Sequence, residues 1–244
     1  MLLCDCLVEK GNTLFRYRGY VYFLALPMLY LERGHIHHFG HGHACYELFC
    51  VLVSVLGMLV RALTMGFVPR GTSGRNKRAQ HAEALNTTGM YSICRNPLYL
   101  GNYLVFLGIT LLGQSWELVV MNTFLFAAMH VPIILTEERY LLGEFGERYR
   151  DYASVTPCFF PRPSLWKSPA LPWNWWLVVR REHDTALSVA LAYVFVGCLR
   201  DSVMRGRVSM DLRWAIVGLA SVLLWLAVKV AKRPLRRLSE RVAA

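Results

Sequence analysis

Two apolar runs, at residues 44–68 and 118–136, limit what this chain can fold into more than any other feature. Each is long enough to cross the hydrocarbon core of a bilayer, which is about 30 Å thick and needs roughly 20 apolar residues in one helix. Further apolar runs occupy residues 14–31, 98–113, 186–199 and 212–231. In addition, 55% of the 244 residues are hydrophobic, more than a soluble domain needs for its core. We expect an all-α, multi-pass transmembrane helical bundle with about five to six spanning helices.

The first and fifth runs are weaker than the others. Residues 14–31 contain Arg16 and Arg18, so this run spans only if both arginines reach back to the interface. No small-residue cleavage signal follows it, which favours a retained anchor. The run 186–199 is short and could lie in the interface. We expect it to cross together with 212–231, because the basic cluster after that run then lies in the cytoplasm.

The charges of the loops give an orientation, because Lys and Arg accumulate on the cytoplasmic side of short loops. Basic residues are frequent in 69–97 and after residue 136, whereas the connection Gly113–Glu117 has none. The two runs beside this connection are therefore predicted to form a hairpin whose open ends lie in the cytoplasm. If the last two runs also cross, four arginines fall outside and break the rule: Arg200, Arg205, Arg207 and Arg213.

We expect the whole chain, residues 1–244, to form a single membrane domain, with a motif core at 72–162 and additional membrane helices at 184–231. In a bacterium it would occupy the inner membrane, and in a eukaryote the endoplasmic reticulum. The net charge of +11 favours anionic lipid headgroups as partners. Nucleic acid is not expected, because the basic residues flank apolar segments. Seven cysteines without a CxxC pair predict neither a zinc site nor a disulfide framework.

The stretch "CRNPLYLGN", residues 94–102, marks the start of a predicted helix. Pro97 suits the first helical position, and Asn96 before it suits the N-cap. Gly101 lets another backbone or a flat ligand approach. With Arg95 beside the positive end of the helix, the stretch is either an anion site or an ordinary helix start with an interfacial arginine.

A second stretch, "TEERY" at residues 136–140, ends the run 118–136 with two adjacent carboxylates. Ionisable groups at the end of a membrane helix need partners and are functional candidates. For Glu137 and Glu138 the predicted partners are Arg95 and Arg61. The alternative is that both glutamates begin a solvated amphipathic helix.

Taken together, "GMYSICRNPLYLGN", "EERYLLGEFGERYRDY" and "FFP" resemble the isoprenylcysteine carboxyl methyltransferase and phospholipid methyltransferase superfamily over residues 72–162. The resemblance implies an integral membrane enzyme that uses S-adenosylmethionine in a cofactor cleft at the cytoplasmic surface. The catalytic residues that it implies are Arg95, Glu137 and Glu138. The implied cofactor contacts are Tyr91, Asn96, Pro97, Tyr99, Gly101 and Glu137, and the arginine of the first motif would help to hold the anionic group of the substrate.

The chain departs from the superfamily pattern at two places. Relatives usually carry histidine where this chain has Asn96, which can hydrogen-bond but does not titrate. Isoprenylcysteine enzymes also tend to carry a basic residue where this chain has Ala153 and Ser154. We expect the acceptor to be a membrane lipid or lipid-like amphiphile. Among these, we rank lipid headgroups above a prenylcysteine carboxylate.

The nature of the acceptor atom decides which side chains the chemistry needs. Methyl transfer is an in-line displacement, so the protein chiefly holds two partners at attack distance in a dry site. A phosphate or carboxylate acceptor needs positioning, which Arg95 and Arg61 would provide as substrate-binding residues. An amine acceptor must lose a proton, and Glu137 or Glu138 would take it.

A different function class follows from "HIHHFGHGH", since imidazoles at this density can bind zinc, copper or nickel. The weak candidate ligands are His35, His37, His38, His41 and His43. A metal transporter or sensor is thus the first alternative, although no repeated acidic or histidine pair marks an ion pathway. A non-catalytic membrane scaffold is the second, and it leaves the paired motifs unexplained.

Overall fold

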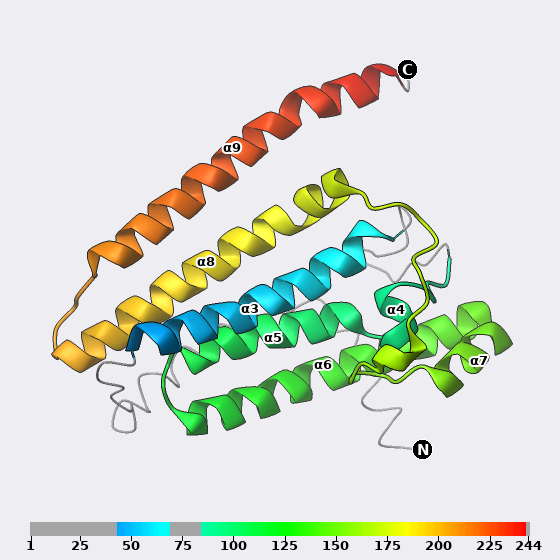
Figure 1. Cartoon of the computed structure of the whole chain (residues 1–244), viewed down its shortest axis with the longest axis horizontal. Helices are drawn as coiled ribbons and strands as arrows, with labels where there is room; N and C mark the ends of the chain where they lie inside the picture. Colours follow the sequence, from blue (N-terminus) through cyan, green and yellow to red (C-terminus); the bar gives the residue numbers. More distant parts are fainter. Residues whose placement is uncertain (1–42, 69–83, 243–244) are drawn as a thin grey trace. The chain divides into compact units, whose positions relative to one another are not determined.

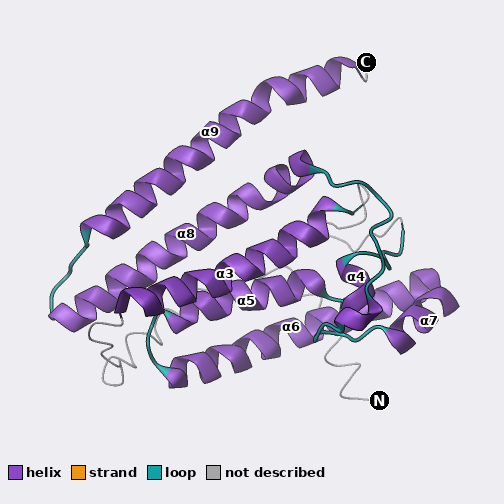
Figure 2. Ribbon diagram, in the orientation of Figure 1, coloured by secondary structure: helices purple, strands orange, loops and turns teal. Residues whose placement is uncertain are grey.

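The structure is a computed structural model that describes residues 43–68 and 84–242. All secondary structure in these residues is helical, without a strand (Figure 2). The elements are α3 (His43–Gly66), α4 (Met90–Ile93), α5 (Pro97–Leu111), α6 (Trp116–Phe145), α7 (Glu147–Val155), the 3-10 turn η2 (Pro163–Leu165), α8 (Trp175–Arg205) and α9 (Leu212–Val242).

Four of these helices are long and apolar enough to cross a membrane. The candidate spans are Ala44–Gly66, Trp116–Phe145, Trp175–Val203 and Leu212–Lys232. Helix α5 is apolar but has 15 residues, which is about 22 Å and short of the hydrocarbon core. The predicted class, a multi-pass helical membrane protein, is confirmed. The first apolar run, 14–31, lies outside the described residues.

The ends of the helices follow from local chemistry. Pro97 occupies the first turn of α5, as predicted, because its missing N–H costs nothing there. Helix α6 begins at a true cap, since the Ser115 hydroxyl accepts a hydrogen bond from the Leu118 N–H at 3.2 Å. Gly146, with φ of +54°, separates α6 from α7, a conformation that favours glycine. The fourth run thus continues as a helix beyond its apolar part, to Phe145.

Helix α5 lies between α3 and α6 (Figure 1). Small residues let α3 and α5 approach closely: a Cβ added to Gly57 would lie 2.6 Å from the Gly101 carbonyl oxygen. About one helical turn from this glycine pair, the Ser54 hydroxyl donates to the Val105 carbonyl oxygen at 2.9 Å. Small residues and interhelical hydrogen bonds are the usual means of helix association in membranes, where lipid removes the hydrophobic driving force. The α3–α5 pair thus forms the centre of the motif region.

The last two helices are joined by a charged cluster. Arg200, 2% exposed, donates from Nη2 to Asp201 Oδ1 at 2.8 Å. The other carboxylate oxygen of Asp201 accepts from Arg213 Nη2 at 3.3 Å and from Trp214 Nε1 at 3.1 Å. Asp211 lies 3.6 Å from Arg213 Nε. The two aspartates offset part of the positive charge that disagreed with the expected orientation of the α8–α9 connection.

By their internal contacts the residues form two compact units, 1–174 and 175–244. The first unit contains both motifs, and the second contains α8 and α9. The division falls just before the additional helices predicted at 184–231. The grouping of both units into a single membrane domain stays a prediction.

Candidate functional site

The two sequence motifs meet through an ion pair between Arg95 and Glu138. Arg95 Nε donates to Glu138 Oε1 at 2.9 Å, and Nη2 donates to Oε2 at 3.0 Å. This two-pronged geometry is the strongest that an arginine and a carboxylate make. The side chains are 15% and 18% exposed, so solvent screens them little. The predicted pairing of the second motif with Arg95 is therefore present, and Glu138 provides it.

Arg95 also binds the C-terminal end of α7. Its Nη1 donates to the carbonyl oxygens of Ala153 at 2.7 Å and Thr156 at 3.0 Å. With the two bonds to Glu138, four of its five N–H groups are used. Burial by itself would lower the pKa of Arg95, but the adjacent Glu138 carboxylate more than offsets this and raises it. In this structure Arg95 thus joins α5, α6 and the end of α7.

Asn96 does not cap α5, contrary to our prediction. It stands at the N-cap position, but its side chain makes no capping bond. Instead Nδ2 donates to Glu138 Oε1 and to the Cys158 carbonyl oxygen, both at 3.1 Å. The side chain is buried, so the charged acceptor outcompetes the local backbone donor. Asn96 is therefore a second donor to Glu138.

Glu137 faces a different partner from Glu138, as the turn of about 100° between neighbouring helical residues requires. Its Oε1 accepts a hydrogen bond from the Tyr99 hydroxyl at 2.9 Å. The Tyr99 ring meets the buried His130 ring edge-on at 5.5 Å. His130 in turn stacks on Phe126 at 3.8 Å, and its Nδ1 lies 3.0 Å from the Phe126 carbonyl oxygen. Rings on both helices thus hold the Tyr99–Glu137 pair in place.

Three buried or half-buried tyrosines lie near the two motifs: Tyr91, Tyr149 and Tyr152. The Tyr152 hydroxyl donates to the Tyr91 carbonyl oxygen at 2.7 Å. Burial is the main cause that raises the pKa of Tyr91, Tyr149 and Tyr152, with nearby carboxylate or phenol groups adding to it. Tyr149 is buried, and its hydroxyl has no hydrogen-bond partner among the described residues. The phenols stay protonated and can donate hydrogen bonds.

Two cysteines also lie at the site, although sequence reasoning gave them no part in it. The Cys94 thiol donates to the Phe159 carbonyl oxygen at 3.1 Å, and Cys158 Sγ lies 3.5 Å from Glu138 Oε1. Burial raises the pKa of Cys94 to about 11 and also raises that of Cys158. Both are free thiols. The proximity of Cys158 to Glu138 depends on a loop that no helical periodicity marks.

The remaining predicted site residues lie around the start of α5. Pro97 begins the helix, and Gly101 faces α3, where an added Cβ would meet the Gly57 carbonyl oxygen at 2.8 Å. Of the two roles open for Gly101, close approach of a backbone is the one seen. Arg61 Nη1 donates to Asn102 Oδ1. A pairing of Arg61 with a glutamate of the second motif, and its role in substrate binding, stay predictions.

Metal ligation is not supported within the part of the chain that the structure describes. These residues contain no group of three or more His, Cys, Asp or Glu side chains that could hold a metal ion. His35, His37, His38 and His41 lie outside the described residues, and only the backbone of His43 is described. The predicted metal site is therefore untested.

Comparison with known proteins identifies a family for the same region. Residues 47–148 match the family described as phospholipid methyltransferase. The chain is 37% identical to the cobalt-zinc-cadmium resistance protein CzcN of Cupriavidus metallidurans over 132 residues, which are 53% of this chain and 58% of that protein. It is 33% identical to the nickel-cobalt-cadmium resistance protein NccN of Alcaligenes xylosoxydans xylosoxydans over 127 residues, 52% of this chain and 59% of that protein.

These matches cover less than two thirds of each relative. No solved structure matches the chain. The family match contains the first motif, the Arg95–Glu138 pair and the Tyr99–Glu137 pair. The resemblance predicted from the motifs is thereby confirmed, since residues 47–148 of this chain match the phospholipid methyltransferase family.

Proposed function

We propose that this protein is an integral membrane methyltransferase that moves a methyl group from S-adenosylmethionine to a lipid or lipid-like amphiphile at the cytoplasmic face. The observation that carries the proposal is the family match over 47–148, whose two motifs contact each other through both glutamates.

The side chains around Glu137 fit the chemistry of S-adenosylmethionine. The Glu137 carboxylate, next to the Tyr99 hydroxyl, can accept hydrogen bonds from ribose hydroxyls or an ammonium group, and the nearby protonated Tyr91 phenol can donate to a carboxylate. The half-buried Tyr99 ring offers a face to a purine or a sulfonium. When bound, the cofactor supplies a methyl group on a positively charged sulfur. Glu137, Tyr99 and Tyr91 would hold it, while Glu138 acts through Arg95 and Asn96.

Arg95 and Arg61 would bind the acceptor. Arg95 keeps one N–H outside the bonds to Glu138, Ala153 and Thr156, so it can contribute a single hydrogen bond to an anionic headgroup. Arg61 would provide the second cation. If the acceptor is an amine, the nitrogen must be neutral to attack, and Glu137 would take its proton. Lipid amine, lipid phosphate and carboxylate are the acceptor classes that these groups allow.

Calorimetric titration of S-adenosylhomocysteine into the full-length protein in detergent tests the proposal. The unmutated protein should bind, and Glu137→Gln and Tyr99→Phe should each weaken binding by about tenfold, as loss of a charge-assisted hydrogen bond does. Glu144→Gln removes an exposed carboxylate from the same helix and should leave binding unchanged. If the unmutated protein shows no binding, the enzyme proposal is wrong.

Mass spectrometry of lipid extracts would identify the acceptor. Extracts from cells with the gene should contain a lipid heavier by one methyl group than its counterpart in cells without the gene. The same lipid should return to its unmethylated mass when the gene carries Glu137→Gln.

A second candidate, metal handling, is favoured by the names of the two relatives, both of which are called metal resistance proteins. The five histidines between residues 35 and 43 would be its ligands. Metal analysis of protein purified without a His-tag separates the candidates. Bound zinc, cobalt or nickel that disappears when the five histidines are replaced by alanine would support this function, and a metal-free protein would exclude it.

A further inference from the structure

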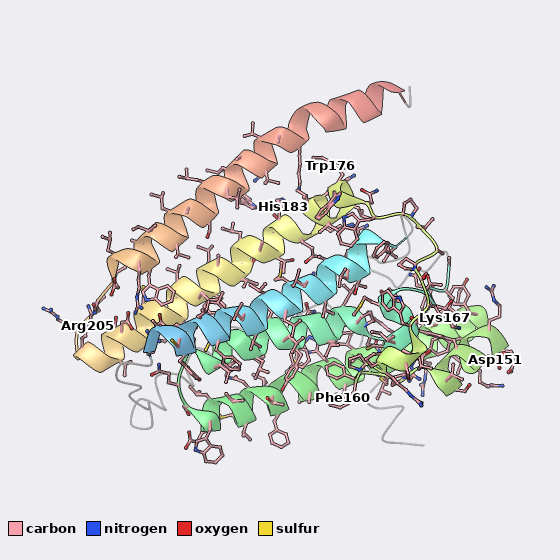
Figure 3. The ribbon with its side chains drawn as sticks, viewed as in Figure 1. Asp151, Phe160, Lys167, Trp176, His183 and Arg205 are labelled. Atoms are coloured by element: carbon pink, nitrogen blue, oxygen red, sulfur yellow. The ribbon has the colours of Figure 1, made fainter. Side chains whose placement is uncertain are left out.

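The chain between α7 and α8 exposes large apolar side chains. Phe160 is 81% exposed, Trp166 49% and Leu171 41%. Figure 3 labels Phe160 together with Lys167 of the same stretch. Apolar side chains in this number, presented by one short segment, indicate a partner surface. We refer to residues 156–171 as the docking segment.

The exposure does not come from a loose loop, because the backbone of the docking segment is hydrogen-bonded along its length. The Arg162 N–H donates to the Ile93 carbonyl oxygen, and the Lys167 carbonyl oxygen accepts from the Gly89 N–H, both at 2.9 Å. The Lys167 N–H donates to the Ser92 hydroxyl at 2.9 Å. The inner side of the segment is thus fixed to α4, while Phe160, Trp166 and Leu171 remain exposed.

The end of this connection is fixed to α3. The Asn174 N–H donates to the Gly66 carbonyl oxygen at 2.9 Å. Trp173 packs edge-on against Phe67 at 5.0 Å, and its ring fills the space beside Gly66. Trp173 is half-buried and is therefore not one of the exposed side chains of this connection. The remaining exposed side chains therefore sit on a rigid support at the end of a candidate membrane span.

Sequence continuity and charge identify the partner. The segment follows the candidate span that ends at Phe145 and precedes the one that begins at Trp175, so it lies where the chain is at the membrane surface. Residues 156–174 contain Arg162 and Lys167, both exposed, and no Asp or Glu. Aromatic rings with basic residues are typical of the headgroup region of anionic membranes. We propose that the docking segment inserts its apolar side chains into the headgroup and acyl boundary of an anionic bilayer.

The docking segment is also bonded to the candidate site, and this part of the inference rests on the proposed function. Phe160 packs edge-on against Phe159 at 5.6 Å, and Phe159 against Tyr103 of α5 at 6.2 Å. The carbonyl oxygens of Cys158 and Phe159 accept hydrogen bonds from Asn96 and Cys94. Insertion of Phe160 thus fixes the height of the motif residues relative to the lipid headgroups.

Photo-crosslinking in vesicles of phosphatidylethanolamine and phosphatidylglycerol tests the docking. The full-length protein carries p-benzoylphenylalanine at position 160 or 166, and the matched control carries it at Asp151, an exposed polar position on α7. Positions 160 and 166 should give lipid adducts several-fold above position 151. Arg162→Ala should lower the phosphatidylglycerol adduct at position 160 by about fivefold, as loss of one basic contact predicts. Lipid adducts no more frequent than at position 151, or adducts to a protein in native membranes, would overturn the inference.

Phe160→Ser separates docking from the proposed function. This exposed position tolerates a polar residue, so binding of S-adenosylhomocysteine should be unchanged while methyl transfer to vesicle lipid falls several-fold. Unchanged transfer would refute the coupling between docking and site. Lipid adducts at position 160 in a protein that binds no S-adenosylhomocysteine would support docking and refute the methyltransferase proposal.

Discussion

At the scale of single residues, the contacts of Arg95 and Asn96 give the first motif a structural task. Both side chains donate to Glu138 and to backbone carbonyl oxygens that follow Tyr152. A charged pair with so many bonds tolerates burial because nearly every lone pair and N–H is used. The pair therefore holds the start of α5 against the C-terminal part of α6.

Glu138→Gln should destabilise the protein by about 2 kcal/mol, because it leaves the half-buried Arg95 charge without its carboxylate. Glu147→Gln is the matched control, since Glu147 and its partner Arg150 are 72% and 65% exposed and solvent already screens them. Thermal unfolding in detergent should show a fall of several degrees for the first variant and little change for the second. Equal shifts for the two variants would contradict the assigned role.

The Cys94 thiol predicts a pH dependence at alkaline pH. Burial raises its pKa from 9.0 to about 11. Below pH 9 the thiol is protonated in both the folded and the unfolded chain. Between about pH 9 and 11 the unfolded chain loses this proton while the folded chain keeps it, so the free energy of unfolding decreases as pH rises.

Thermal melts between pH 8 and 11 check this expectation. Cys94→Ala should make the decrease in melting temperature over this range less steep than in the unmutated protein. Cys45→Ala, which removes an exposed thiol from α3, should leave the slope unchanged. An unaltered slope in Cys94→Ala would rule out the contribution of this thiol.

At the scale of elements, the crossing of α3 and α5 depends on glycine. Added Cβ atoms would lie 2.6 Å from a backbone oxygen at Gly57, 2.8 Å at Gly101 and 2.5 Å at Gly108. The opposing atoms are backbone, which cannot rotate away as a side chain can. The two helices therefore approach closely along several turns, and the start of α5 is held at a fixed position against α3.

Gly57→Ala should cost about 2 kcal/mol, because the new methyl group forces the two helices apart. Gly143→Ala is the control within α6: nothing lies within 4 Å of its added Cβ, and alanine should stabilise the helix by about 0.5–1 kcal/mol. Opposite shifts in the melting temperature are expected in detergent. A stabilising Gly57→Ala would show that the helices do not pack this closely.

At the scale of the whole molecule, the predicted orientation places the α5–α6 connection and the α7 region on opposite sides of the membrane. Trp116, 65% exposed, marks the first region and Asp151 the second. Trp116→Cys should react with a membrane-impermeant maleimide in intact cells. Asp151→Cys should react only after permeabilisation, since the basic residues near it belong in the cytoplasm.

This labelling needs a background with Cys4→Ser, Cys6→Ser and Cys45→Ser, and the yield is measured above that background. Reaction of both positions from outside would contradict the two-sided hairpin. The reverse pattern would invert the orientation and move the candidate site away from the cytoplasm.

The class of fold and the two motifs could be predicted from the sequence, because a membrane imposes helices on any long apolar run and the motifs are local in the chain. The sequence did not locate the end of α6 at Phe145, because the apolar run 118–136 stops earlier in the chain. The sequence did not predict the role of Asn96 either. Its position in the chain favours an N-cap, whereas the Glu138 carboxylate to which it donates comes from another helix.

Three features depend on how the helices pack: which glutamate meets which partner, the contact of Gly101 with α3, and the position of Cys94 and Cys158 beside the ion pair. These contacts join residues that are 38 or more positions apart or that sit in a loop without periodicity. Apolar patterning specifies which face of a helix is buried, but the partner across that face depends on how the helices cross and on how the chain after α7 returns to α4.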